Sequence, residues 1–162
     1  MHPSVAIMWR EYMALRALEG EEEPAFSHWH FCDNERDADE CARLVVSGAK
    51  RATAPSLWSI ESQGEPIPRA GDLHVVTNWA GQAQCIIRIT VVEVVPLDRI
   101  SEEHARAEGE GDGSLAWWHD AHWSYYHREL EGSGYAPQPD MPIVFQWFDC
   151  VYPSRPRLAH SQ

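Results

Sequence analysis

Lys50 is the only lysine in the chain, whereas the other 12 of its 13 basic residues are arginine. Arginine can replace lysine on a solvated surface, but a guanidinium does not give up its proton. A lysine in a partly dry pocket can lose its proton near neutral pH, and it could then deprotonate a hydroxyl such as that of Thr53. A carboxylate such as Glu108 could orient the lysine or act as acid and base. These residue types indicate nucleophilic catalysis by a hydroxyl group.

An ordinary structural interpretation of the same residues stays open. Lys50 could lie on the surface, left as the one lysine by a compositional preference for arginine, and Thr53 could be a plain strand residue. The acidic segment that begins at Glu108 could cap a helix. Spacing along the chain does not show whether the three groups meet, nor whether Glu108, Glu110 or Asp112 faces the lysine.

Several side chains near these groups are candidates for holding a base or a phosphate. Trp58 closely follows Thr53 on the same expected loop and could stack on a base, although core packing is the usual role of a tryptophan. Two arginines could contact a phosphate, or they could pair with the many acidic residues. The candidate substrate-binding residues are Arg51, Trp58, Arg88, Glu110 and Ser114.

The histidines and cysteines give weaker signals. Two histidine pairs have a spacing that suits metal ligands, but neither forms an HExxH pattern: His28 with His30, and His119 with His122. The cysteines form no CxxC pair, so they predict neither a disulfide framework nor a zinc site, and we interpret them as buried small hydrophobes: Cys32, Cys41, Cys85 and Cys150. We therefore expect no metal ion and no other cofactor.

The composition limits the class of protein. A chain of 162 residues of which 44% are hydrophobic can bury one core, which indicates a single domain. The formal net charge of −12 repels long nucleic acid, which argues against a DNA-coating role and suits a small ligand or a short single-stranded RNA in a local pocket. No apolar run can span a bilayer, and Arg10, Glu11 and Arg16 interrupt the segment that a secretory signal would need. We expect a cytoplasmic protein with no membrane partner, and the oligomeric state stays open.

Local signals place the candidate groups at the ends of predicted elements. Asn34 and Gly48 are typical caps of a helix between them, so Lys50 and Thr53 follow on a loop or at the start of a strand. Ser114 is a typical N-cap of a later helix. The other predictions are helices over residues 5–18, 101–107 and 114–132, strands over 73–79, 84–95 and 143–151, and disorder after residue 153. This order of elements indicates an α+β fold with a small barrel or a curled sheet.

The segment Gly48-Ala49-Lys50-Arg51-Ala52-Thr53 is similar to the GxKxxT signature of ASCH domains. The resemblance covers about residues 8–152 and includes Trp29-His30-Phe31, Gly71-Asp72, Cys85-Ile86-Ile87, Glu93, Glu108-Gly109-Glu110-Gly111-Asp112, Ser114-Leu115, Trp118, His122 and Asp140-Met141-Pro142. It implies a PUA-like small β-barrel with flanking helices. It also divides the chain into an N-terminal helix and connector at residues 1–25, an ASCH domain at 26–152 and a disordered tail at 153–162.

The resemblance implies functions that are linked to RNA. Some small members of the family are amidohydrolases that cleave N(4)-acetylcytidine with a lysine, a threonine and a glutamate, which correspond here to Lys50, Thr53 and Glu108. Longer members, which this chain resembles, have been linked to cleavage of single-stranded RNA, and others are known as RNA-binding or co-regulator modules. The leading hypothesis is an amidohydrolase that acts on an acylated cytidine. A single-strand ribonuclease and a non-catalytic RNA-binding module are the alternatives.

The chain departs from the longer members of this family at three positions. They commonly have arginine where Ala49 and Gly113 stand, and glycine where Cys32 stands. The loss of two arginines weakens the contacts that a phosphate would need. The departures therefore favour a small neutral nucleoside over an RNA strand.

Overall fold

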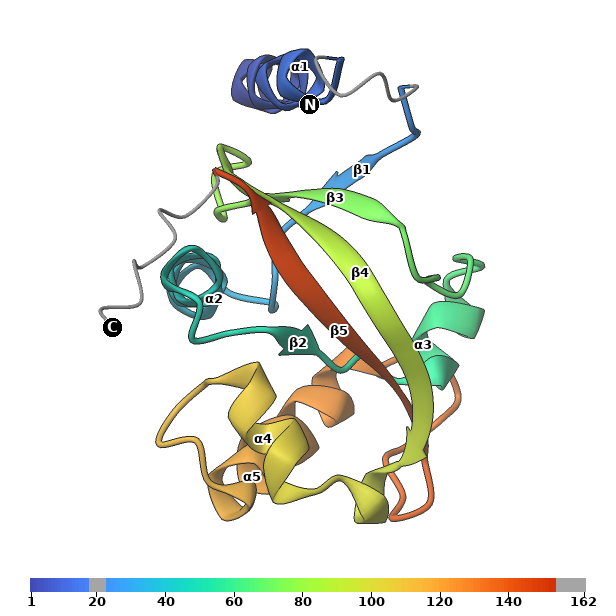
Figure 1. The fold of residues 1–162 in the computed structure, drawn as a ribbon. Helices are drawn as coiled ribbons and strands as arrows, with labels where there is room; N and C mark the ends of the chain where they lie inside the picture. Colours follow the sequence, from blue (N-terminus) through green and yellow to red (C-terminus); the bar gives the residue numbers. More distant parts are fainter. Residues whose placement is uncertain (18–22, 154–162) are drawn as a thin grey trace, which may run out of the picture.

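The computed structural model describes residues 1–17 and 23–153, so the predicted end of the first helix at Leu18 and the predicted disorder of residues 154–162 lie outside it. The α+β class is confirmed, with five strands and flanking helices (Figure 1). In chain order the elements are α1 (Pro3–Ala17), β1 (Ser27–Trp29), α2 (Glu35–Ser47), β2 (Ala52–Thr53), α3 (Leu57–Ser62), β3 (Leu73–Thr77), β4 (Ala83–Pro96), the 3-10 turn Leu97–Arg99, α4 (Glu102–Glu108), α5 (Leu115–Glu129) and β5 (Pro142–Tyr152). No helix within the described residues is both long and apolar enough to cross a membrane.

The five strands form one mixed sheet in the order β1-β3-β4-β5-β2. The long strands β4 and β5 pair antiparallel from Ile86 and Tyr152 at one end to Pro96 and Pro142 at the other. The short strand β1 runs parallel to β3, and β2 runs antiparallel to β5. The sheet is open and not the closed small barrel that the resemblance implied, because its two edge strands have only three and two residues.

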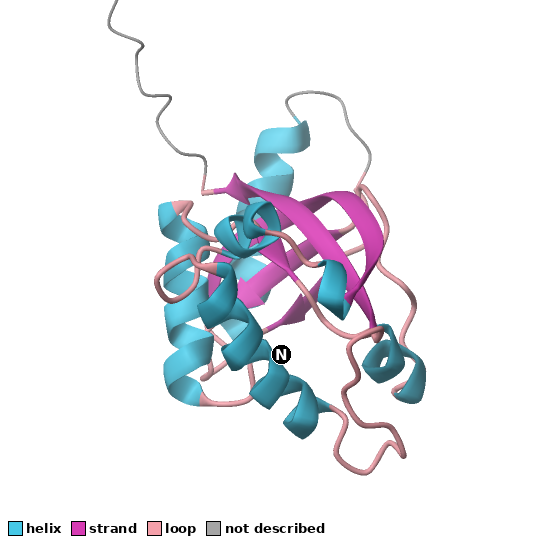
Figure 2. Cartoon of the chain, turned by 90° about the horizontal axis from the view of Figure 1, so that it is seen from below, coloured by secondary structure: helices cyan, strands magenta, loops and turns pink. Residues whose placement is uncertain are grey.

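Strand β4 curves along its length (Figure 1), and the helices lie around the sheet (Figure 2). Its pairing with β5 shifts register twice, between Ile86 and Ile87 and between Ile89 and Val91. An extra residue in one strand of a pair bends that strand and increases its twist. These irregularities allow a strand of 14 residues to bend, as its predicted length suggested.

Helix α2 begins and ends where its sequence predicted. The side chain of Asn34 accepts a hydrogen bond from the backbone N–H of Asp37, and Gly48 closes the helix with a left-handed φ of 84°. Its buried face packs with residues of β3, β4 and β5 in one apolar cluster. Lys50 follows two residues after Gly48, so the end of α2 fixes the position of the lysine backbone.

Helix α4 ends against the segment that carries Lys50. Its C-cap Gly109 has a φ of 65°, and a Cβ at this position would lie 2.0 Å from the carbonyl oxygen of Ala49. The backbone N–H of Arg51 also donates to the carbonyl oxygen of Ala107 at 2.7 Å. This contact, which only glycine permits, brings Glu108 next to Lys50.

Three helices remain, and in Figure 1 α5 lies below the sheet, α3 to its right and α1 above it. Ser114 caps α5 as predicted, by accepting a hydrogen bond from the backbone N–H of Trp117, and the buried face of α5 carries Trp118, His122 and Tyr126. Helix α3 was not predicted, and it places Trp58 on a short helix instead of a loop. Helix α1 lies at the opposite end and packs on β3 and β4.

Candidate functional site

Lys50 is buried, with 2% of its surface exposed. Its Nζ donates to Glu108 Oε2 at 2.6 Å and to Glu110 Oε1 at 3.1 Å. The same ammonium lies 5.0 Å from the centre of the Phe31 ring, within the range of a cation–π contact. The one lysine of the chain is therefore held between two carboxylates and an aromatic ring.

Glu108 is equally buried and has a partner on each oxygen. Its Oε1 accepts a hydrogen bond from the indole Nε1 of Trp118 at 3.2 Å and lies 3.2 Å from Nε2 of His122. The His122 ring stacks on Trp118 and donates from Nδ1 to the carbonyl oxygen of that residue. Helix α5 thus fixes the carboxylate that holds Lys50.

The electrostatics of this cluster contradict one expectation from the sequence. Burial by itself lowers the pKa of Lys50, but the charges of Glu108 and Glu110 outweigh it and hold that pKa above its ordinary value. Burial likewise raises the pKa of Glu108, but Lys50 and then His122 bring it below its ordinary value. The expectation of a neutral lysine is wrong for the resting protein, because two carboxylates converge on an amine that burial alone would neutralise.

These residues line a cleft of about 1170 Å³ together with Thr53 and Gln146. Thr53 of β2 lies directly opposite Gln146 of β5 in an antiparallel pair, and such residues project from the same face of the sheet. Within the described residues, neither the Thr53 hydroxyl nor the Gln146 amide has a side-chain hydrogen-bond partner in the protein. Both polar groups are therefore free to meet a ligand in the cleft.

The structure separates the other predicted substrate-binding residues from this cleft. Lys50, Thr53, Glu108 and Glu110 line it together, whereas Arg51, Trp58, Arg88 and Ser114 are not among its lining residues. The Trp58 ring stacks on Tyr135, with 5.0 Å between centres and a 19° angle, so its stacking face is already occupied.

The two predicted arginines also lie away from the cleft. Arg88 donates to the hydroxyl of Tyr12 in α1, and Arg51 is exposed beside β2. Two arginines that the sequence analysis did not single out, Arg36 and Arg128, line the cleft instead. Each pairs with a neighbouring acid, Arg36 with Asp37 at 2.9 Å and Arg128 with Asp33 at 2.6 Å.

Gln146 is a site residue that sequence reasoning missed. It is 5% exposed in the middle of the apolar strand Pro142–Tyr152. A polar side chain at a buried position of a strand needs a partner or a function. That signal was present in the sequence, but its position opposite Thr53 depends on a pairing between distant segments.

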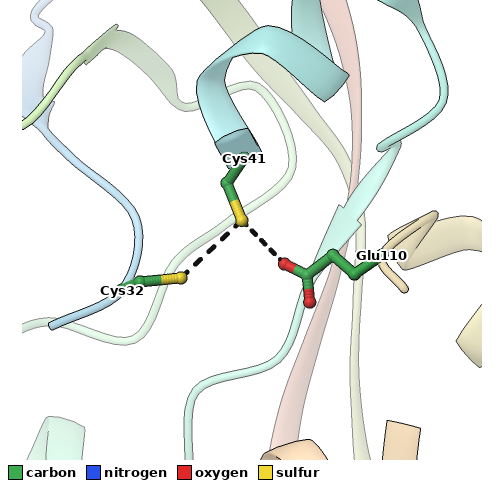
Figure 3. A group of neighbouring side chains, drawn as sticks. All are labelled: Cys32, Cys41 and Glu110. Carbon is green, nitrogen blue, oxygen red and sulfur yellow. Dashed lines mark hydrogen bonds between the residues drawn. The ribbon is translucent and has the colours of Figure 1, made fainter. Parts of the chain in front are cut away.

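Two cysteines, Cys32 on the loop before α2 and Cys41 within α2, lie beside the carboxylate of Glu110 (Figure 3). Cys32 Sγ is 3.6 Å from Cys41 Sγ, and the Cys41 thiol donates to Glu110 Oε1 at 2.8 Å. Cys32 is only partly buried and lines the cleft with Cys41. Cys150 is also only partly buried, so the interpretation of all four cysteines as buried hydrophobes is wrong for Cys32 and Cys150.

Two groups of side chains have atoms close enough to share a metal ion. The first is Cys32, Cys41 and Glu110, and the second is Glu108, Glu110 and His122. In the second group both oxygens of Glu108 accept hydrogen bonds, from Lys50 and from Trp118. In the first group Glu110 Oε1 accepts from Lys50 and from the Cys41 thiol, so an ion there would replace the thiol proton and leave both oxygens of Glu108 in place.

Comparison with known proteins matches residues 27–152 to the ASCH domain. The chain belongs to the ASCH domain family, whose fold is of the PUA-like, RNA-binding type. An ASCH domain structure from Lactobacillus crispatus is 37% identical with a TM-score of 0.86, and the match covers 93% of this chain and 96% of that one. A protein structure from Enterococcus faecalis is 30% identical with a TM-score of 0.82, covering 93% and 90% of the two chains. No curated protein sequence matches the chain.

Proposed function

We propose that the chain is a hydrolase of the exocyclic amide of an acylated cytidine of the N(4)-acetylcytidine type. One observation carries the proposal: Lys50, the single lysine, is buried between two carboxylates in the cleft that also holds the Thr53 hydroxyl. The products would be cytidine and a carboxylate such as acetate.

The burial of these charges supports a functional role for the cluster. Replacing a buried ion pair with apolar residues of similar volume is often neutral or stabilising, so such a pair is weak evidence for stability. Strongly shifted pKa values with specific charge partners in a cleft are typical of functional sites. Lys50 and Glu108 have both properties.

In the proposed reaction the Thr53 oxygen attacks the acyl carbon, and the bond from that carbon to the exocyclic nitrogen breaks. Lys50 takes the hydroxyl proton as it passes its own proton to Glu108 across the 2.6 Å hydrogen bond. The departing nitrogen receives the proton that Glu108 now holds, and cytidine leaves. Water then hydrolyses the Thr53 ester and releases the carboxylate.

Gln146 has a role in this proposal because its amide lies beside Thr53 on the same face of the sheet. An amide N–H that points at the acyl oxygen stabilises the negative charge that develops there during attack. The amide has no other partner among the described side chains, so it does not have to break a hydrogen bond first. We assign Gln146 as the donor to the acyl oxygen.

The charge around the cleft favours a neutral nucleoside over a long RNA. The lining arginines Arg36 and Arg128 are each paired with an aspartate, and the whole chain carries a net charge of −12. Phosphates bind best where cationic side chains are available to them. The cleft is larger than the ~300–1,000 Å³ typical of small-ligand pockets. The preference for a neutral nucleoside therefore rests on the charges around the cleft and not on its volume.

The experiment is hydrolysis of N(4)-acetylcytidine, followed by chromatography of the released cytidine. Thr53→Val keeps the shape of the side chain and removes the hydroxyl, so turnover should be lost, whereas Thr53→Ser should retain part of it. Ser124→Ala is the matched control, because it removes another hydroxyl from the lining of the same cleft and should leave turnover unchanged. Thermal unfolding of each variant checks that the fold is intact.

Absence of turnover by the wild-type protein would refute the amidohydrolase proposal. The alternatives would then be tested with a short single-stranded RNA. Cleavage that is lost in Thr53→Val would indicate a ribonuclease. Binding without cleavage, weakening steeply as salt rises, would indicate an RNA-binding module.

A further inference from the structure

We propose that Cys32, Cys41 and Glu110 form a binding site for a thiophilic divalent cation of the Zn²⁺ class. One ligand atom from each residue lies within 4.8 Å of the others (Figure 3). Zinc binds thiolates at ~2.3 Å and carboxylate oxygens at ~2.0–2.2 Å in tetrahedral sites. Two thiolates around one such ion are separated by roughly 3.8 Å, and the two sulfurs here are 3.6 Å apart.

The three ligands need only a small rearrangement to hold an ion. The sulfur of Cys41 and the oxygen of Glu110 are 2.8 Å apart because a proton lies between them. An ion in place of that proton would push these two atoms apart by less than about 1 Å. All three residues line the cleft, so an ion can enter, and the fourth coordination position can be filled by water or a ligand.

The charge balance of the cluster also permits a divalent cation. Lys50 faces the site through its 3.1 Å hydrogen bond to Glu110, and Glu108 lies on the far side of that ammonium at 2.6 Å. Binding of one Zn²⁺ by two thiols forms two sulfur–metal bonds and releases two protons. The net charge of the cluster is therefore the same before and after the ion binds, and Lys50 keeps its bond to Glu108.

The backbone at Cys32 is the independent observation that supports this site. Its φ of 59° is the only left-handed φ of a non-glycine residue among the described residues. A left-handed conformation costs a residue with a side chain roughly 1–2 kcal/mol, whereas glycine adopts it readily. Strain of this kind clusters at ligand-binding positions. With this backbone conformation the Cys32 sulfur lies 3.6 Å from the Cys41 sulfur.

The test is titration of the reduced, full-length protein with Co²⁺, observed through the thiolate-to-cobalt charge-transfer absorption, followed by displacement with Zn²⁺. We expect one ion per chain. Calorimetry in buffers of different ionisation enthalpy should count two protons released per Zn²⁺. Loss of a residue that only hydrogen-bonds to a metal ligand lowers metal affinity by about 10–100-fold. Cys32→Gly removes a ligand itself, so this variant should bind Zn²⁺ at least about 100-fold more weakly than the wild type.

Cys32→Gly is the sharpest variant, because it removes the thiol and relieves the left-handed strain, so the protein should fold. Glu110→Gln should also weaken binding. The matched control is Cys150→Ser, which removes a thiol from the second cysteine pair, Cys85 with Cys150, and should bind Zn²⁺ like the wild type.

The proposal is overturned if the cobalt–thiolate absorption is absent from the wild type, if Cys32→Gly binds Zn²⁺ as tightly as the wild type, or if Cys150→Ser abolishes binding. These outcomes are independent of the hydrolase proposal. Thr53→Val should lose turnover and keep its metal affinity, so one proposal can fail while the other stands.

Discussion

Replacing Lys50 with methionine tests the buried ion pair most directly. The substitution keeps an unbranched side chain against Phe31 and removes the charge that faces Glu108 and Glu110. Two unit charges 2.6 Å apart attract by about 6 kcal/mol at an effective dielectric constant of ~20. Desolvation offsets much of this attraction in the intact pair, but the remaining carboxylates stay buried after the lysine is gone.

We therefore expect Lys50→Met to lower the free energy of unfolding by about 3–5 kcal/mol at neutral pH. The double variant Lys50→Met with Glu108→Gln also removes the stranded charge, and glutamine can still accept the hydrogen bond of Trp118. Its loss of stability should be smaller than the sum of the single losses by about 1–3 kcal/mol.

Urea unfolding followed by circular dichroism measures all four proteins, and equal slopes would show that the extent of unfolding is unchanged. A Lys50→Met variant within about 0.5 kcal/mol of the wild type would refute the reasoning, because surface substitutions have effects of that size. Strictly additive effects of the two substitutions would refute it as well, because they would mean that the two charges do not interact.

Three further predictions concern positions around the site. Burial raises the pKa of Glu129 although Ser56 donates hydrogen bonds to it. Between the pKa of Glu129 in the unfolded chain and its higher pKa in the folded protein, only the folded protein holds the proton, so stability falls as pH rises. Glu129→Gln should flatten that fall in thermal unfolding across a pH series. Gly111→Ala should cost about 1–3 kcal/mol in the same measurement and shift tryptophan fluorescence, because the new Cβ would lie 2.1 Å from the Trp117 ring at a φ of 58°. Ser101→Ala should cost about 1 kcal/mol in urea unfolding, because it removes the side-chain cap of α4.

The helices that could be predicted are those whose ends are fixed by neighbouring residues. Asn34 and Gly48 bound α2 as expected, and Ser114 caps α5, because capping uses backbone groups within one helical turn. Helix α3 was missed because its six residues are too few to show a helical period. Its N-cap Ser56 was the one local signal that could have revealed it.

The parts of the site that the sequence could not predict depend on contacts between distant segments. The sequence singled out Lys50, Thr53 and Glu108, and the structure places all three on one cleft. It could not indicate the charge of Lys50, because that depends on where two carboxylates 58 and 60 residues away converge. The pairing of Cys32 with Cys41 likewise depends on an uncommon backbone angle that composition does not reveal.

The strand order has a consequence for how the molecule is made. Strand β5 is the last element of the described residues, yet it lies between β4 and β2 in the sheet. Strand β2 pairs only with β5 among the described strands, so Thr53 has no strand partner until residues 142–152 have been synthesised. Because contacts between distant residues close slowly, we expect the cleft to be completed only once β5 has been synthesised. A nascent chain that lacks β5 should hold α2 and the β3–β4 hairpin but not the cleft.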